Sequence, residues 1–370
     1  MNYSLSVPCL LGLEGPIADE LRRMDLQDVA AENGRVNFRG GAEAVARANI
    51  NLRIGERVLL ELGRFPALSF DELFEGTRAL PWETIIPRDG AFPVKGYSLN
   101  SKLFSVSDCQ KIIKKAIVER LKAVYGIEWF PETGACYQVQ FAMMKDQVSL
   151  SLDTSGDGLH KRGYRPAHNA APLKETMAAA MVTLSRYRGR DDFCDPFCGS
   201  GTIPIEAALI ARNMAPGAGR HFAAMDWRTV EPSLWKTERE LAASREYHGD
   251  YRILGTDLDP KAVAMAKANA QRAGVADVVR FEVADARNFS RQTERGVIVT
   301  NPPYGERIGE KEEAEELYRA FGQAYRSCAN WQLYLLSSHT EFERCFGVEA
   351  DKKRKLYNGM IKCDLFMYYK

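Results

Sequence analysis

Residues 192–213 read DFCDPFCGSGTIPIEAALIARN, a short apolar strand followed by a turn with two glycines and a helix. A helix precedes this stretch at 173–187, and the pattern continues with RILGTDLD (252–259), PKAVAMAKANAQRAGV (260–275), VRFEVAD (279–285) and GVIVTNPP (296–303). Strands separated by helices in this way predict a doubly wound, parallel α/β sheet. Ligands of such sheets bind at the carboxyl ends of the strands, so the polar residues found there are the candidates for a functional site.

The turn after the first of these strands, DPFCGSGT (195–202), contains Gly199 and Gly201. Glycines allow a tight turn and a close approach of a ligand to the amides at the start of the following helix. The pattern is neither GxGxxG nor the Gly-Lys-Ser/Thr of a triphosphate loop. Asp195 would repel a phosphate but can accept a hydrogen bond from an ammonium group, so the turn favours a zwitterionic ligand without phosphate.

The next two strands also end in acidic residues. Asp257 can accept hydrogen bonds from both hydroxyls of a ribose, the role of the acidic residue in Rossmann sites. Asp259 precedes Pro260, so a helix N-cap is its competing role. Asp285 can hold the exocyclic amine of an adenine, with a simple strand-end cap as the alternative. These acids and the glycine turn together describe a site for S-adenosylmethionine, a ligand with amino-acid, ribose and adenine parts.

The last strand of the series ends in TNPPYG (300–305). The prolines supply no N–H, so the strand ladder stops and the carbonyls are left for other partners. The Asn301 side-chain oxygen and the Pro302 carbonyl can accept both hydrogens of a planar amine, which localises its lone pair for attack on a sulfonium methyl group. Tyr304 offers a face for stacking an extruded base. A purely structural turn is the alternative.

The N-terminal part of the chain follows a different pattern. The first 65 residues alternate as strand, helix, strand, strand, helix, strand, with a turn at Asn33-Gly34, which is the order of a ferredoxin-like unit. Beyond them we expect a helix (69–80), a strand (94–100) and a long basic helix (107–124). Two alternating runs then predict a hairpin around Lys145-Asp146.

Basic residues gather in three segments although the formal net charge is only +1. Residues 102–122 carry six basic and two acidic side chains, HKRGYR (160–165) adds three cations beside an aromatic residue, and KKRK (352–355) adds four. A nearly neutral chain can therefore still present basic faces to RNA. For the long basic helix, a solvated surface without a nucleic-acid partner is the alternative.

Length and composition set the frame for these motifs. At 370 residues the chain is longer than most proteins with a single hydrophobic core, so two or three domains are expected. No apolar run approaches the roughly 20 residues of a membrane span, and the first residues lack a secretory signal, so we expect a cytoplasmic protein without a membrane partner. The eight cysteines show no spacing typical of metal sites, so we expect free thiols and no metal.

The motifs DPFCGSGT, GTDLD, AD and NPPYGER resemble those of Rossmann-type, S-adenosylmethionine-dependent methyltransferases that modify amino nitrogens. The segments KLFSVSDCQKIIKKAIVERL and DTSGDGLHKRGYRPAHNAAPLKET resemble the THUMP-containing branch, whose members methylate guanine N2 in ribosomal or transfer RNA. The chain is most similar to bacterial large-subunit rRNA guanine-N2 methyltransferases. This resemblance implies S-adenosylmethionine as the cofactor, RNA as the partner, and a C-terminal antiparallel hairpin from NGMIKCDLFMYYK (358–370).

The resemblance also divides the chain into a ferredoxin-like domain (1–65), a THUMP RNA-binding domain (66–160) and a Rossmann-like methyltransferase domain (161–370). It implies catalytic roles for Asn301, Pro302, Pro303 and Tyr304. It implies cofactor binding by Asp195, Pro196, Phe197, Cys198, Gly199, Ser200, Gly201, Thr202, Asp257, Leu258, Asp285, Ala286 and Asn301. Asp195 and Asp257 lie 62 positions apart, where about 20 is usual, so residues 212–250 are expected to form a lid-like or helical insertion.

The expected function is methylation of the exocyclic N2 of a guanosine in RNA, with 23S ribosomal RNA as the first substrate and transfer RNA as an alternative. Adenine-N6 and glutamine methyltransferases share NPPY because their targets are also planar amines, but the basic N-terminal module favours RNA over DNA. A non-catalytic RNA-binding assembly factor is a further alternative, which the intact Asp195, Asp257 and Asn301 oppose. The glycine pattern and the wide spacing to Asp257 disfavour a nicotinamide dehydrogenase.

Overall fold

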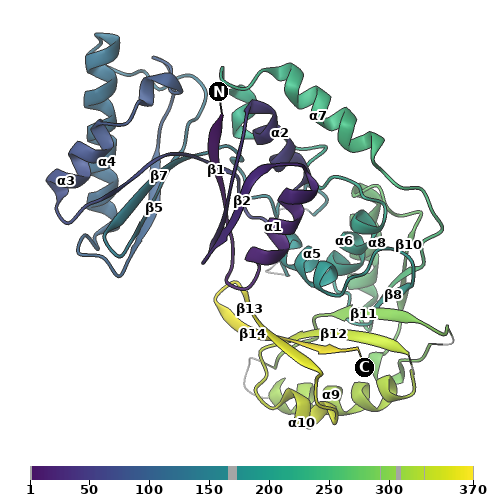
Figure 1. Ribbon diagram of the computed structural model, residues 1–370. Helices are drawn as coiled ribbons and strands as arrows, with labels where there is room; N and C mark the ends of the chain where they lie inside the picture. The colour runs from purple at the N-terminus through teal and green to yellow at the C-terminus, as the bar shows by residue number, and fades with distance from the viewer. Residues whose placement is uncertain (1, 166–172, 292, 306–309, 329, 370) are drawn as a thin grey trace. The chain divides into compact units, whose positions relative to one another are not determined.

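The structure is a computed structural model that describes residues 2–165, 173–291, 293–305, 310–328 and 330–369 (Figure 1). It divides into two compact units, each with its own seven-stranded sheet. The first unit contains Met1–Cys9, Ile17–Leu159 and Arg220–Leu241. The second contains Leu10–Pro16, His160–Gly219 and Ala242–Lys370.

The N-terminal half of the first sheet has the predicted βαββαβ order. Its elements are β1 (Tyr3–Pro8), α1 (Glu14–Arg23), β2 (Gln27–Glu32), β3 (Arg35–Gly40), α2 (Ala42–Asn51) and β4 (Leu59–Pro66). The strands lie in the order β2-β3-β1-β4, and β2 and β3 form the predicted antiparallel hairpin. The apolar residues Leu5 and Val7 of β1 and Val36 and Phe38 of β3 occupy alternate positions and are buried, so their side chains enter the core from one face of the sheet.

The same sheet continues into the second half of this unit, because β4 pairs with β7. The added elements are α3 (Phe70–Arg78), η1 (Trp82–Thr84), β5 (Val94–Leu99), α4 (Val106–Tyr125), β6 (Val139–Met144) and β7 (Gln147–Asp153). Lys145 and Asp146 join β6 to β7 in the predicted hairpin. Their φ angles of 50° and 61° are both left-handed, as in a type I′ turn. The long helix α4 ends at Gly126, which is left-handed.

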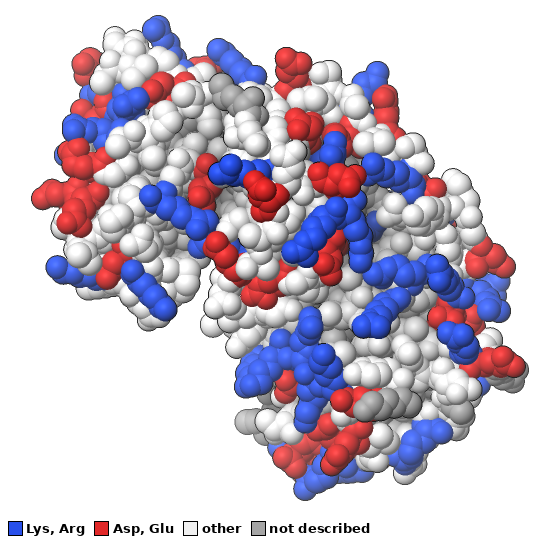
Figure 2. Space-filling view, viewed as in Figure 1, with Lys and Arg blue, Asp and Glu red and all other residues white. Residues whose placement is uncertain are grey.

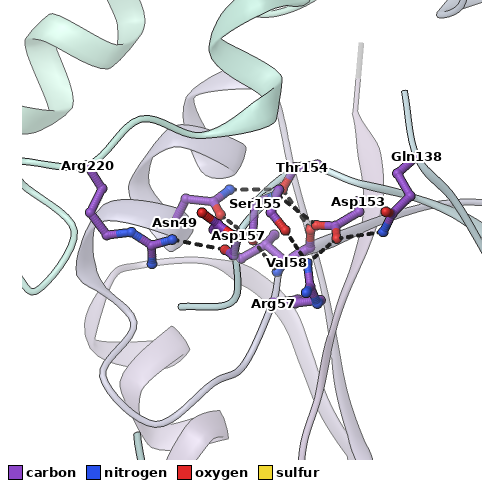
Figure 3. A network of polar contacts seen from close by, with 10 residues as sticks. Asn49, Arg57, Val58, Gln138, Asp153, Thr154, Ser155, Asp157 and Arg220 are labelled. Atoms are coloured by element: carbon purple, nitrogen blue, oxygen red, sulfur yellow. Dashed lines mark hydrogen bonds and ion pairs between the residues drawn. The ribbon is translucent and has the colours of Figure 1, made fainter. Parts of the chain in front are cut away.

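A buried polar network joins the two halves of this sheet at the end of β7 (Figure 3). The fully buried Asp153 carboxylate accepts hydrogen bonds from the Arg57 guanidinium, from Gln138 (3.3 Å), and from the amides of Ser155 (3.0 Å) and Gly156 (3.2 Å). Burial raises the pKa of Asp153, and the Arg57 charge opposes this effect. Neighbouring hydrogen bonds join Asn49 to Thr154 (2.9 Å) and Ser155 (2.6 Å), and Val58 to the same two residues (2.7 and 2.9 Å).

The insertion expected at 212–250 is partly helical, with η2 (Ala223–Asp226) and α7 (Pro232–Ser244). Its middle, Arg220–Leu241, belongs to the first unit. Arg47 of α2 makes two hydrogen bonds to Glu238 of α7, at 2.9 and 2.8 Å, and the Trp227 indole donates to the Cys136 carbonyl at 2.9 Å. The chain therefore leaves the second unit, adds a helix to the first, and returns.

The second sheet has the strand order β10-β9-β8-β11-β12-β14-β13. The first five, β10 (Val279–Val283), β9 (Ile253–Asp257), β8 (Asp192–Asp195), β11 (Gly296–Thr300) and β12 (Trp331–Ser337), are parallel. The predicted C-terminal hairpin closes the sheet as β13 (Lys352–Asn358) and β14 (Ile361–Tyr368), with β14 antiparallel to β12. The strand order reverses between β8 and β11, so the carboxyl ends of these two strands flank the switch point where such sheets bind ligands.

Helices cover both faces of this sheet (Figure 1). They are α5 (Glu175–Leu184), α6 (Thr202–Ala211) and α8 (Pro260–Arg272) on one face, and α9 (Glu310–Arg326) and α10 (Phe342–Phe346) on the other, with the short η3 (Ala286–Asn288) after β10. An aromatic core that includes Phe321, Trp331, Phe342, Phe346 and Phe366 lies under α9 and α10. Helices α9 and α10 and strand β12 were not predicted from the sequence. The α/β class and the parallel sheet are confirmed.

Candidate functional site

A cavity of about 600 Å³ lies at the carboxyl ends of the strands of the second sheet. Its lining consists of Pro196, Phe197, Asp257, Leu258, Asp285, Ala286, Arg287, Asn301, Pro303, Glu313, Glu316 and Leu317. The structure thus brings together eight of the predicted site residues, which come from the ends of β8, β9, β10 and β11. The remaining predicted residues, Asp195, Cys198, Gly199, Ser200, Gly201, Thr202, Pro302 and Tyr304, are close to the lining in sequence but are not part of it.

The glycine turn has open space beside Gly199. Gly199 and Gly201 both have left-handed φ angles, 50° and 81°, and a Cβ atom added to Gly199 would meet no atom within 4 Å. Two hydrogen bonds to neighbouring elements fix the backbone of the turn. The Cys198 amide donates to the Thr256 carbonyl of β9 (2.9 Å), and the Asn269 side chain of α8 donates to the Ser200 carbonyl (2.8 Å). A ligand can therefore approach this backbone closely.

Asp195 lies at the switch point and is only 1% exposed. Its Oδ1 accepts hydrogen bonds from the Thr300 hydroxyl (2.6 Å) and the Phe197 amide (3.1 Å), which ties the end of β8 to the end of β11. Burial raises the pKa of Asp195 to about 7, and the Thr300 hydrogen bond opposes the shift. A cationic group that binds beside this carboxylate would favour its ionised form.

Asp257 connects two of the predicted motifs. Its Oδ2 accepts a hydrogen bond from the Gly199 amide (2.9 Å) and its Oδ1 accepts one from the Asp259 amide (3.0 Å). Asp259 in turn caps α8, since its Oδ1 accepts from the Lys261 amide at 2.8 Å and Pro260 follows it. The N-cap alternative for Asp259 is thereby confirmed, while Asp257 keeps a carboxylate on the cavity wall.

Asp285 occupies the third strand end. It caps η3, because its Oδ1 accepts a hydrogen bond from the Arg287 amide (2.9 Å), and it forms an ion pair with the Arg287 guanidinium (2.6 Å). The Arg287 hydrogen bonds hold the pKa of Asp285 below its usual range. The capping role that the sequence left open is therefore present, and Asp285 and Arg287 both line the cavity.

The NPPY segment is fixed by contacts that sequence reasoning missed. The Tyr304 hydroxyl donates to the Asn301 side-chain oxygen, and the Cys363 thiol of β14 lies 3.8 Å from the same hydroxyl. The Tyr318 hydroxyl of α9 donates to the Pro303 carbonyl at 2.6 Å. Burial raises the pKa of Tyr304, so this phenol stays protonated as a donor. Neither Tyr318 nor Cys363 belongs to a motif, and no local signal in the sequence marks them.

The HKRGYR segment does not form the basic face that its charges suggested. The Arg162 side chain is 2% exposed and lies 3.4 Å from Glu206, which also accepts a hydrogen bond from the Tyr164 hydroxyl at 3.0 Å. Arg165 makes two hydrogen bonds to Glu175, at 2.8 and 2.6 Å. Arg162 and Arg165 therefore neutralise buried carboxylates inside the second unit, while Lys161 is exposed, so the prediction of a surface patch made by all three cations was wrong. Residues 166–172, together with Glu306 and Arg307 of NPPYGER, lie outside the described residues.

The basic side chains of α4 are also largely neutralised. Lys111 pairs with Asp108 (3.4 Å), Lys114 with Glu132 (2.6 Å), Arg120 with Glu83 (2.5 Å) and Lys122 with Glu128 (3.0 Å). The Lys115 ammonium lies 5.9 Å from the centre of the Phe74 ring. The helix surface is therefore close to electrically balanced, which fits the alternative of a solvated face.

Two further properties concern the whole described chain. Among the helices in the described ranges, none has the length and apolarity needed to cross a membrane. In the same ranges, no group of three or more His, Cys, Asp or Glu side chains is placed to hold a metal ion.

Family models match all three parts of the chain. One described as "RMKL-like, methyltransferase domain" matches residues 162–366, one described as "RlmL ferredoxin-like domain" matches 4–59, and one described as "THUMP domain" matches 67–153. The first match covers more than half of the chain, so the protein belongs to the RMKL-like methyltransferase family. The expected combination of a methyltransferase fold with ferredoxin-like and THUMP domains is confirmed, and the cofactor is S-adenosylmethionine.

Individual relatives sharpen this assignment. The chain is 46% identical to "Putative RNA methyltransferase YpsC" of Bacillus subtilis (strain 168), over 100% of this chain and 96% of that protein. It is 34% identical to "Ribosomal RNA large subunit methyltransferase K/L" of Psychromonas ingrahamii, over 99% of this chain and 50% of that protein, and so spans about half of the relative's length. The crystal structure of SMU.472 complexed with SAH is similar with a TM-score of 0.94 and 40% identity, covering 100% of this chain and 98% of that chain.

Proposed function

We propose that the protein transfers the methyl group of S-adenosylmethionine to N2 of a guanosine in RNA, with large-subunit ribosomal RNA as the substrate. Relatives named as RNA and large-subunit rRNA methyltransferases support the substrate class, as does the THUMP domain. The observation that carries the proposal is the position of Asn301, which follows β11 and lines the same cavity as Asp257 and Asp285.

The residues of the cavity fit the parts of the cofactor. Bound S-adenosylmethionine supplies an electrophilic methyl group on a sulfonium ion. Asp195 lies beside the switch point and would attract the ammonium group, while the open backbone at Gly199 accommodates the amino-acid part. Asp257 would bind the ribose hydroxyls, and Asp285 with Ala286 would lie at the adenine. The turn lacks the lysine of a triphosphate loop, which agrees with a ligand that carries no phosphate.

The other end of the cavity would hold the base. The Asn301 side-chain oxygen accepts one hydrogen bond from Tyr304 and has a second lone pair for an amine hydrogen. No described residue donates to the Pro302 carbonyl, whereas Tyr318 already occupies the Pro303 carbonyl. Asn301 and Pro302 would thus accept the two hydrogens of the guanine amine and stabilise its positive charge until a proton leaves after methyl transfer.

The test is methyl transfer from labelled S-adenosylmethionine to total RNA from a strain that lacks this protein, followed by nucleoside analysis. We expect label in N2-methylguanosine within large-subunit rRNA. Label in N2-methylguanosine of transfer RNA would support the proposed reaction but show that the substrate is transfer RNA. Label in N6-methyladenosine or in DNA, or no label in any nucleic acid, would contradict the proposal.

Two variants separate the two halves of the site. Asn301→Ala should lower kcat about 10²- to 10³-fold, because it removes an acceptor that stabilises the transition state, and should leave the cofactor Kd nearly unchanged. Asp257→Ala should weaken cofactor binding measured by calorimetry. Wild-type turnover in the first variant, or wild-type cofactor affinity in the second, would contradict the role of that residue.

A further inference from the structure

The C-terminal hairpin carries a dense group of cations. We call residues 352–362 (KKRKLYNGMIK), which are β13, the turn and the start of β14, the basic hairpin; it contains five basic and no acidic residues. Figure 2 shows Lys and Arg side chains gathered where Figure 1 places β13 and β14. Of these five cations, only Lys353 forms an ion pair with a described residue, Glu343 at 2.6 Å, and the Arg354 guanidinium donates a hydrogen bond to the Gly12 carbonyl at 3.1 Å. The remaining four are Lys352, Arg354, Lys355 and Lys362.

The basic hairpin lies beside the end of the site that would hold the base. Cys363, which pairs with Leu356 across the hairpin, places its Sγ atom 3.8 Å from the Tyr304 hydroxyl. Burial raises the pKa of the Tyr304 phenol, and the side chain of Asn358, in the same hairpin, lies close enough to oppose this larger effect. Tyr304 in turn donates to Asn301. The cations therefore belong to an element that is in direct contact with the NPPY segment.

A second explanation of these charges has to be weighed. β13 is the edge strand of its sheet, and lysines on edge strands prevent pairing with other chains. Edge protection does not require contact with the catalytic segment, nor does it account for Lys362, which lies on β14. The basic helix α4 shows that cations elsewhere in the chain are matched by nearby carboxylates. In the described part of the basic hairpin only Lys353 forms an ion pair, although Asp364 lies opposite Lys355 in the strand register. Most of the charge of the basic hairpin therefore remains available to an anionic partner.

We propose that the basic hairpin binds the phosphate backbone of the nucleotides next to the target guanosine while Asn301 and Pro302 hold its base. This inference rests on the proposed function, since it assigns the RNA contact of the same site. Phosphate contacts fix the register of a nucleic acid without reading its sequence. The basic hairpin would therefore align the strand at the cavity, and the choice of nucleotide would be made elsewhere.

The test compares two triple variants with the same change in charge. One is Lys352→Gln, Lys355→Gln, Lys362→Gln in the basic hairpin, and the other is Lys111→Gln, Lys115→Gln, Lys122→Gln in α4. Binding to purified large-subunit rRNA is measured by filter retention from 50 to 200 mM salt, and cofactor binding is measured by calorimetry. Loss of three phosphate contacts should lower the slope of log K against log salt by about 2 and weaken RNA binding at least tenfold at 50 mM salt.

For the α4 variant we expect RNA binding within about twofold of wild type, and for both variants an unchanged cofactor Kd. A wild-type salt slope in the basic-hairpin variant would overturn the inference, and self-association of that variant in sedimentation would then identify edge protection as the role of the lysines. Equal losses in the two variants would also overturn it, because only total charge would matter. Failure of the proposed function is seen separately, as absence of methyl transfer to RNA by the wild-type protein.

Discussion

Two turns in this chain have similar sequences and different surroundings. DTSG follows β7 in the first unit, and DPFCGSG follows β8 in the second. Each begins with an aspartate that is almost fully buried, Asp153 at 0% and Asp195 at 1% exposure, and burial raises the pKa of both. Each also contains a glycine with a left-handed φ angle, 76° at Gly156 and 50° at Gly199.

The partners of these residues differ. Asp153 accepts hydrogen bonds from the Arg57 guanidinium and from two backbone amides, whereas the hydrogen bonds of Asp195 come from one hydroxyl and one amide. A Cβ atom on Gly156 would lie 3.2 Å from Ala223, whereas one on Gly199 would meet nothing within 4 Å. The first turn is closed by protein at Gly156, and the second is open at Gly199, although its other glycine, Gly201, packs against Ala266 and Phe281. A buried aspartate followed by a left-handed glycine therefore marks a turn that is fixed by its surroundings. Whether that turn is structural or can bind a ligand depends on whether the space beside the glycine is filled by protein.

The largest expected effect tests the closed turn. Asp153→Ala should destabilise the protein by about 3–5 kcal/mol, because it leaves the Arg57 charge and two buried amides without their partner. The measurement is urea unfolding followed by circular dichroism, with Asp153→Asn as a milder variant that keeps an acceptor oxygen. Under conditions where it is folded, the Ala variant should bind S-adenosylmethionine with wild-type affinity. Unchanged stability would show that the network does not hold the two halves of the sheet together.

An effect of intermediate size tests the open turn. Asp195 has a pKa of about 7 in the free protein, and an ammonium group attracts only its ionised form. Cofactor affinity should therefore be constant above that pKa and should fall by up to about tenfold per pH unit below it. Calorimetry between pH 5.5 and 7.5 keeps most of the cofactor's α-amino group protonated, because the pKa of that group is about 8.

The matched control for this pH dependence is Asp195→Asn, which keeps the hydrogen-bonding shape and cannot ionise. It should bind the cofactor more weakly at pH 7.5 and lose the dependence on pH. A flat profile in the wild-type protein, or the same slope in both proteins, would mean that Asp195 does not meet the ammonium group.

Much of the fold could be predicted because its signals are local. Alternation of apolar residues marks the strands of the first sheet, and Lys145-Asp146 marks a hairpin turn. Strand ends followed by glycine, aspartate or proline located the cavity. The segment that forms α9, β12 and α10 was not predicted, because Phe321 and Phe342 find their partners only through the tertiary structure.

The charges were the least predictable feature. Arg162 and Glu206 are 44 positions apart, and Arg120 and Glu83 are 37 apart, so neither ion pair can be read from a local pattern. Runs of basic residues therefore looked alike in the sequence, although one is mostly buried, one is mostly ion-paired and one is mostly exposed with an ion pair only at Lys353 among its described residues. Only the positions of the carboxylates separate the three.

The smallest expected effect compares the two glycines directly. Gly199→Ala and Gly156→Ala each place a Cβ atom on a left-handed residue, at a cost of about 1 kcal/mol in stability. Only the first adds a methyl group to space that the cofactor would use, so cofactor affinity should fall about five- to tenfold in Gly199→Ala and stay within twofold in Gly156→Ala. Urea unfolding and calorimetry on both variants separate the two quantities. If both variants lost cofactor affinity equally, the loss would come from backbone strain and not from the added methyl group. The open space beside Gly199 would then not be the place where the cofactor lies.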